Sequence, residues 1–173
     1  MVHDLSRSYA SLMLCFRTSC LALVLLLGLS ACGDNQQPAE ARMMWQRLLD
    51  LDYKNTFARA PGYEERQRSR APHGDRVDIY VDPILQEAIE IGMPITEWPL
   101  GSLVVKDGWD NDGDFDLVAA MEKREDGWFY VEWTDRSGEA LYSGRPDICV
   151  DCHRAGDDFI RAFPFPADPE PMP

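Results

Sequence analysis

Positive charge is scarce in this chain of 173 residues, which has 17 Lys and Arg against 30 Asp and Glu and a formal net charge of −13. Because nucleic-acid binding needs a basic face to meet the phosphates, this balance excludes nucleic acid as a partner. Long apolar runs are also missing, since Leu21–Leu29 is far shorter than the roughly 20 residues of a membrane-spanning helix. An apolar content of 45% nevertheless excludes a disordered chain, and the length suits one domain with a core.

Cysteine is scarce as well, with five residues, and an odd number does not suit a framework of paired disulfides. The positions of the cysteines are more informative than their number. Cys15, Cys20 and Cys32 lie close to the N-terminus, whereas Cys149 and Cys152 lie close to the C-terminus. The two groups therefore call for separate interpretations.

The N-terminal cysteines lie in or next to an export signal. Arg7 and Arg17 precede the apolar run Leu21–Leu29, and small residues follow it, which is the layout of a secretory signal peptide. Leu29–Cys32 (LSAC) resembles a bacterial lipobox, in which Cys32 is lipidated and becomes the first residue of the mature protein. An ordinary cleavage site nearby and an uncleaved anchor helix are the alternatives.

The C-terminal cysteines belong to the sequence Cys149-Val150-Asp151-Cys152-His153, a C-x-x-C-H motif typical of c-type haem attachment. Two thiols three residues apart, along one side of a tight turn, reach the two vinyl groups of one haem, and His153 binds the iron as an axial ligand. A thioredoxin-type motif would need a β-α-β context, and a zinc site would need two further ligands. A simple disulfide would leave His153 without a role.

Residues between these two sites predict a mainly β (α+β) fold, an antiparallel sheet with flanking short helices and a C-terminal haem-attachment segment. Periodicity near 3.6 predicts a helix over 39–53, and Asp82-Pro83 begins a second helix that ends at Gly92. Residues 55–74 read as a long loop. Strands are predicted over 77–81, 100–106, 117–122, 128–133 and 139–142, with a hairpin turn at Asp126-Gly127.

The order of these segments resembles the cytochrome P-460 family, including its β-sheet cytochromes c-prime. The resemblance runs from about Pro72 to Phe163 and ends in the C-x-x-C-H motif. One departure is Asp82, where the family usually has Asn. The matching pieces are Pro72-His73-Gly74, Val77–Asp82, Trp98–Lys106, Ala120–Lys123, Gly127–Tyr130, Cys149–His153 and Asp157–Phe159.

The resemblance implies a five-coordinate haem whose open face binds small nitrogen species such as nitric oxide or hydroxylamine, often in a homodimer. In some members a lysine is bonded to the haem macrocycle. Lys106 matches that lysine best, Lys123 is the second candidate, and Lys54 lies outside the matched region. The ordinary alternative for Lys106 is a solvated side chain at a strand end.

Several residues are candidates for the open face of such a haem. A carboxylate there, from Glu122 or Glu132, would accept protons in hydroxylamine oxidation, whereas a wall of Phe129 or Phe115 would favour gas binding. His73 is a candidate distal ligand or propionate partner, although a histidine in this context is more often bonded to backbone.

Other functions stay open. A six-coordinate electron carrier without substrate turnover would need an upstream ligand such as Met93 or Met121, and a non-haem lipoprotein would need none. The alternating aspartates near Gly113 suggest calcium, but the EF-hand template fails because it would put Gly108 first and Ala119 last.

The expected organisation is a lipoprotein signal peptide over 1–31, a tether over 32–38, a haem domain over 39–163 and a Pro-rich tail over 164–173. Cys32 then holds the domain on the periplasmic side of a bacterial membrane through its lipid. One haem c is expected as the only cofactor. The acidic charge of the exported domain makes a basic redox protein the partner to expect.

Overall fold

The computed structural model describes residues 36–69 and 72–166, and within them the strands form one antiparallel sheet. Its order is β1-β3-β4-β5-β6-β7, and β2 also pairs with β3. The strands are β1 (Ala58–Arg59), β2 (Gln67–Arg68), β3 (Arg76–Val81), β4 (Leu103–Trp109), β5 (Phe115–Arg124), β6 (Gly127–Trp133) and β7 (Tyr142–Gly144). The predicted antiparallel sheet is therefore confirmed.

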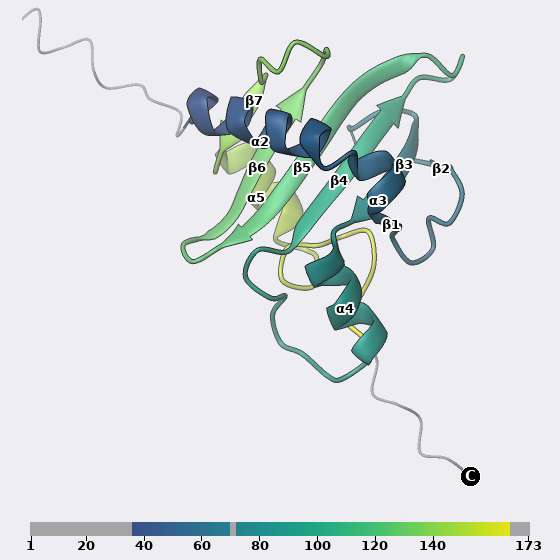
Figure 1. Ribbon diagram of the computed structural model, residues 1–173, viewed down its shortest axis with the longest axis vertical. Helices are drawn as coiled ribbons and strands as arrows, with labels where there is room; N and C mark the ends of the chain where they lie inside the picture. The colour runs from purple at the N-terminus through teal and green to yellow at the C-terminus, as the bar shows by residue number, and fades with distance from the viewer. Residues whose placement is uncertain (1–35, 70–71, 167–173) are drawn as a thin grey trace, which may run out of the picture. The chain divides into compact units, whose positions relative to one another are not determined.

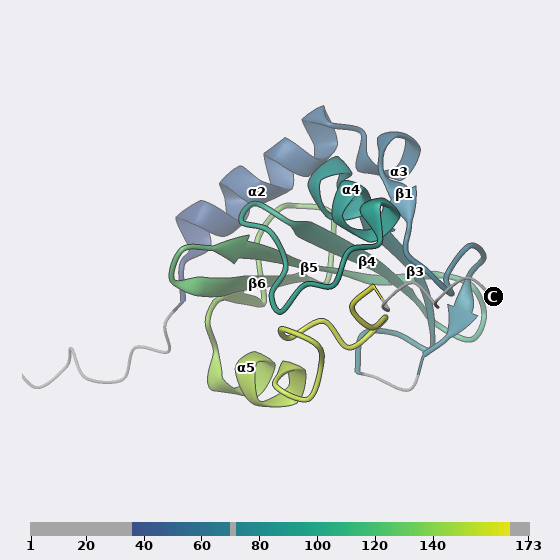
Figure 2. The same cartoon turned by 90° about the horizontal axis from the view of Figure 1, so that it is seen from below.

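Short helices flank this sheet, as predicted: α2 (Pro38–Asp50), α3 (Tyr53–Thr56), α4 (Pro83–Ile91) and α5 (Asp147–His153). Helix α2 lies across one face of the sheet, whereas α5 and the segment after it lie on the opposite face (Figure 1, Figure 2). No helix in the described ranges is both long and apolar enough to cross a membrane. The predicted signal peptide and Cys32 lie outside the described residues.

Helix α2 forms because its apolar residues recur on one side. Ala41, Met44, Trp45 and Leu48 are buried, and their spacing of three and four residues puts them on the face that meets the sheet. Pro38 stands in the first turn, where its missing N–H has no helical partner to lose.

Asp82 connects β3, α4 and β4. Its carboxylate oxygen Oδ1 accepts a hydrogen bond from the backbone N–H of Leu85 at 3.1 Å, which caps α4. The same oxygen accepts from the N–H of Leu103 at 3.0 Å, at the start of β4. One buried side chain thus fixes the helix start relative to the next strand, and α4 ends at Gly92 as predicted.

The alternation of side chains divides the core in two. On the α2 face, residues such as Val105, Val118 and Trp133 pack with the helix. On the opposite face, Ile79 and Val104 pack with the C-terminal segment. Because side chains alternate along a strand, neighbouring residues of β4 belong to different cores.

Several predicted boundaries differ from the structure. The predicted loop over 55–74 contains the end of α3 and the short strands β1 and β2, which are only two residues each and carry no periodic pattern. Strand β4 begins at Leu103 rather than at residue 100 and continues to Trp109, and β5 begins at Phe115. The predicted strand over 139–142 is instead β7.

Candidate functional site

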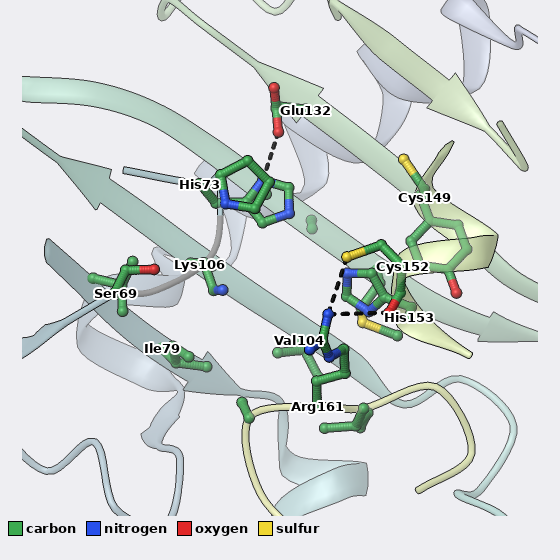
Figure 3. A pocket seen from close by; sticks show the side chains of 18 of the residues that line it. Ser69, His73, Ile79, Val104, Lys106, Glu132, Cys149, Cys152, His153 and Arg161 are labelled. Atoms are coloured by element: carbon green, nitrogen blue, oxygen red, sulfur yellow. Dashed lines mark hydrogen bonds and ion pairs between the residues drawn. The ribbon is translucent and has the colours of Figure 1, made fainter. Parts of the chain in front are cut away.

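A cavity of about 590 Å³ opens between the sheet face opposite α2, helix α5 and the C-terminal segment (Figure 3). This volume falls within the range of roughly 300–1,000 Å³ that is usual for small-molecule and cofactor pockets. The polar and sulfur-bearing residues that line it include His73, Lys106, Glu132, Cys149, Cys152 and His153.

The C-x-x-C-H motif forms most of the short helix α5, not the tight turn that the sequence suggested. The helix still brings both thiols and the imidazole to the cavity wall, because residues three and four apart lie on one side of a helix. Both cysteines are free thiols. Burial, followed by the charges of Glu132 and Cys152, raises the pKa of Cys149 to about 11, so this thiol is not an activated redox nucleophile.

His153 is held in one tautomer. Its Nδ1 lies 2.9 Å from the carbonyl oxygen of Phe159, which can only accept, so Nδ1 carries the proton and Nε2 keeps its lone pair. Burial lowers the pKa of His153 to about 4, so the ring is neutral at pH 7. A neutral imidazole with its other nitrogen hydrogen-bonded is the form that binds a metal ion.

The loop that carries the Phe159 carbonyl is anchored by Asp158. This carboxylate accepts hydrogen bonds from Nζ of Lys123 at 2.7 Å and from the backbone N–H of Trp98 at 2.8 Å. The loop also comes so close to Gly156 that a Cβ there would lie 2.2 Å from the carbonyl oxygen of Ile160. Glycine is therefore required for the fold-back that orients His153.

Lys106 reaches the cavity from the middle of β4 (Figure 3). Within the described residues its amine makes no hydrogen bond or ion pair, and burial, followed by the charge of Arg161, lowers its pKa to about 8. The alternative of a solvated lysine at a strand end is therefore wrong. The other two candidate lysines are paired elsewhere, since Lys54 binds Asp107 on the α2 face and Lys123 binds Asp158.

The strand register explains why Lys106 and Glu132 share this cavity. Lys106 pairs with Ala119, and Ala119 pairs with Glu132, so the three lie in one row on the same face. The small side chain of Ala119 leaves space between the two longer ones. A side-chain oxygen of Glu132 lies 2.6 Å from Nδ1 of His73, which therefore donates to the carboxylate and not to backbone.

Three alternative distal residues belong to the opposite face, which corrects the expectation for them. Glu122 binds Arg47 at 2.6 Å and Arg124 at 2.8 Å beneath α2. Phe129 is buried in the α2-side core, and Phe115 packs against that core. None of the three lines the cavity.

The two candidate methionines differ in position. Met121 lines the cavity from β5, whereas Met93 is 63% exposed in the segment after α4 and does not line it. The acidic turn between β4 and β5 bonds to itself, since the backbone N–H of Asp114 donates to Asp110 at 2.8 Å. No group of three metal-ligating side chains occurs in the part of the chain that the structure describes.

Tyr130, Arg161 and Arg68 line the cavity but were not among the predicted site residues. The buried hydroxyl of Tyr130 has no hydrogen-bond partner among the described residues, and its ring centroid lies 5.2 Å from that of His153. Arg161 donates to the carbonyl oxygen and to Sγ of Cys152, each at 3.1 Å. Arg68 also lines the cavity. The alternation of Trp128, Tyr130 and Glu132 along β6 was the available signal for Tyr130.

The chain matches no protein-family model, and a search of curated proteins finds no match. A function for this cavity is therefore inferred from the residues that line it and from the order of the motifs along the chain.

Proposed function

We propose that this cavity holds one haem c, attached through Cys149 and Cys152 with His153 as axial ligand, and that the protein binds or oxidises small nitrogen species. The observation that carries the proposal is the convergence of four reactive side chains on one cavity: both free thiols, the neutral His153 and the unpaired amine of Lys106. Residues far apart in the sequence supply them. Each thiol adds across a haem vinyl group, with sulfur bonded to one carbon and hydrogen to the other, so the step needs no oxidant and has no leaving group.

The residues that line the cavity fit this cofactor. Its walls include apolar side chains such as Ile79 and Val104, which suit a macrocycle. Two polar groups on its wall, the hydroxyl of Tyr130 and the amine of Lys106, make no hydrogen bond to the described residues. Arg68 and Arg161 bring positive charge to the wall, where they would bind the two propionate carboxylates.

Bound there, haem c supplies an iron that takes up small nitrogen ligands and exchanges electrons. Glu132 is the proton acceptor of the site, because its carboxylate lines the cavity and is only 14% exposed. A carboxylate shielded from water and held by His73 keeps a fixed position for a proton released by hydroxylamine. The chain thus contributes proton transfer and orientation beside the iron.

Lys106 is the residue that would bond to the macrocycle. A pKa near 8 leaves a sizeable neutral fraction of the amine near pH 7, and a neutral amine is the nucleophilic form. A bond between Nζ and a ring carbon replaces one N–H and one C–H. Two electrons and two protons leave, so a peroxide-type oxidant must accept them.

The remaining parts of the proposal concern location and partners. Lipidation of Cys32 would hold the domain on the periplasmic side of a bacterial membrane, where haem c is attached. The net charge of −13 would favour a basic redox protein as electron partner. The resemblance adds a homodimer as the expected assembly.

Visible spectra of the oxidised and reduced protein, with and without nitric oxide, test this function. We expect an absorbing protein whose spectrum changes when nitric oxide is added. A low-spin spectrum that nitric oxide leaves unchanged would instead support the six-coordinate electron carrier. Hydroxylamine oxidation with an artificial electron acceptor then separates an enzyme from a gas-binding protein.

A Lys106→Ala variant tests the bond to the macrocycle. A red-shifted Soret band in the reduced wild type, lost in the variant, would support the bond. Lys54→Ala is the matched control, because its amine binds Asp107 on the α2 face and does not line the cavity. A red shift that persists without Lys106 would rule this lysine out.

A further inference from the structure

Two imidazole rings from segments far apart in the sequence approach each other in the cavity. The ring centroids of His73 and His153 are 6.4 Å apart, and the ring planes are inclined by 51°. His73 comes from the segment between β2 and β3, and His153 is the last residue of α5. The sequence offered His73 as a candidate distal ligand or propionate partner, but it gave no distance between the two rings.

In both rings it is Nδ1 that makes the hydrogen bond to the protein. Nδ1 of His153 donates to the Phe159 carbonyl at 2.9 Å, and Nδ1 of His73 donates to Glu132 at 2.6 Å. In the neutral form of each ring, Nε2 then keeps a lone pair. In Figure 3 the edge of the His73 ring opposite Glu132 faces into the cavity, toward His153.

The separation of the two rings suits a shared metal ion. With a metal–nitrogen bond of about 2 Å, two imidazoles that bind one ion from opposite sides have centroids roughly 6 Å apart. The 51° inclination is compatible with this, because an axial imidazole can take any rotation about its metal–nitrogen bond.

The backbone holds His73 in this position. A Cβ on Gly108 of β4 would lie 2.8 Å from the carbonyl oxygen of His73, so the segment can lie against the strand only where β4 has glycine. The N–H of Asp75 donates to the carbonyl of Trp109 at 2.9 Å, which ties the segment to the end of β4. Glu132 then fixes the ring from β6.

Other cavity residues also carry a lone pair that could bind iron, among them Met121 and Lys106. Lys106 must first lose a proton. His73 has the advantage of a carboxylate partner on its far nitrogen, which orients an imidazole ligand and raises its basicity.

We infer that His73 is the second axial ligand of the haem iron in the resting protein, with Glu132 as its positioning residue. This inference rests on the proposed attachment of haem at Cys149 and Cys152. Small nitrogen ligands then bind by displacing His73, so the site is open only in the fraction of molecules in which His73 is released. This sets the affinity of the site for its ligands.

Absorption and electron paramagnetic resonance spectra of the full-length, haem-bearing protein test the inference. We expect low-spin ferric haem in the wild type and high-spin haem in His73→Ala, with low-spin haem restored when imidazole is added to the variant. Met121→Leu, which removes the thioether of another cavity residue at similar volume, is the matched control and should stay low-spin. If His73 is bound in about nine molecules of ten, nitric oxide should bind His73→Ala about tenfold more tightly than the wild type.

High-spin haem in the resting wild type would overturn the inference while leaving the proposed function intact, and it requires no variant. Low-spin haem that persists in His73→Ala, or that is lost in Met121→Leu instead, would also overturn it. A protein without covalently held haem would contradict the proposed function itself, and the role of His73 with it.

Discussion

Two neighbouring charged residues of β4 lie on opposite faces of the sheet and differ in whether their charge is paired. On the α2 face, the fully buried carboxylate of Asp107 accepts from the hydroxyl of Tyr53 at 2.6 Å and binds Lys54. On the cavity face, the amine of Lys106 has neither a hydrogen bond nor an ion pair within the described residues, and burial lowers its pKa. Adjacent residues of one strand thus carry a paired charge at Asp107 and an unpaired amine at Lys106.

This difference distinguishes the α2 face, which stabilises the fold, from the cavity face, which carries the candidate site. Unpaired polar groups in a protein interior are unfavourable, so a folded chain normally pairs them. The α2 face follows that rule with Asp107 and Glu122. The cavity face breaks it at the buried hydroxyl of Tyr130, which has no hydrogen-bond partner among the described residues, and the unpaired amine of Lys106 lines the same cavity. A group that the chain leaves unpaired beside a cavity is available to a ligand.

The largest expected effect comes from removing the two thiols. A Cys149→Ser, Cys152→Ser double variant should lose both thioether bonds, because no other described cysteine lines the cavity. Haem staining after denaturing electrophoresis measures the loss. Each single variant should keep one thioether bond, and haem that stays covalently attached when Lys106→Ala is added to the double variant would show that the cavity is not the attachment site.

The α2 face should depend on its buried charge. Asp107→Ala should lower the free energy of unfolding by about 3–5 kcal/mol, because it leaves Tyr53 and Lys54 without their acceptor. Urea unfolding followed by circular dichroism measures this. Asp112→Ala, at an exposed position in the β4–β5 turn, is the control and should change stability by about 0.5 kcal/mol or less. Equal effects of the two variants would remove the contrast between the faces.

The cavity face should respond in the opposite direction. In the double-serine background, which lacks both attachment thiols, Lys106→Met should raise the free energy of unfolding at pH 7 by about 3 kcal/mol at most, because the folded state disfavours the charged amine.

The pH dependence of Lys106 gives the sign of this effect. Its pKa is about 8 in the folded protein against an ordinary lysine value of 10.5, so the unfolded state binds more protons between these values. Stability should therefore rise from pH 8 to pH 10.5 in the parent and not in Lys106→Met. A parent whose stability falls over that interval, relative to the variant, would show that the amine is paired.

The sequence predicted the fold where a pattern was long enough to read. Alternation identified β3 and β6, and the Asp126-Gly127 signal marked the β5–β6 turn. Strands β1 and β2 have two residues each, and they form because the edge of β3 offers unpaired backbone groups. The β-propensity of two residues carries no information about whether the edge of β3 lies beside them.

The candidate site was predictable in composition but not in arrangement. Spacing alone identified the three residues of the attachment motif. Whether Glu122 or Glu132 faced the cavity depended on strand register, which no single strand reveals. The approach of His73 to His153 depends on the close contact at Gly108, which joins segments distant in the sequence.

The smallest expected effect concerns Asp82, where the cytochrome P-460 family, which the sequence resembles, usually has Asn. Burial raises the pKa of Asp82, so its charge destabilises the folded state as pH rises above the ordinary range for aspartate. Asp82→Asn keeps an oxygen for the N–H groups of Leu85 and Leu103, and should be more stable than the wild type at pH 7 by about 1 kcal/mol or less.

Urea unfolding at pH 4 and pH 7 measures the gain from Asp82→Asn, which should be smaller at pH 4. Asp82→Ala, which removes the cap, is the control and should be less stable than the wild type by about 1 kcal/mol or more. A gain that is larger at pH 4 would contradict this account.

The central claim, one haem held covalently in the cavity by the motif on α5, is tested most directly on the exported wild-type protein. Its intact mass should exceed that of the processed chain and its lipid by one haem. A tryptic peptide containing Cys149 and Cys152 should carry that mass, and its pyridine haemochrome spectrum should be of the c type. A colourless protein, with both cysteines recovered as free thiols or as a disulfide, would contradict the account.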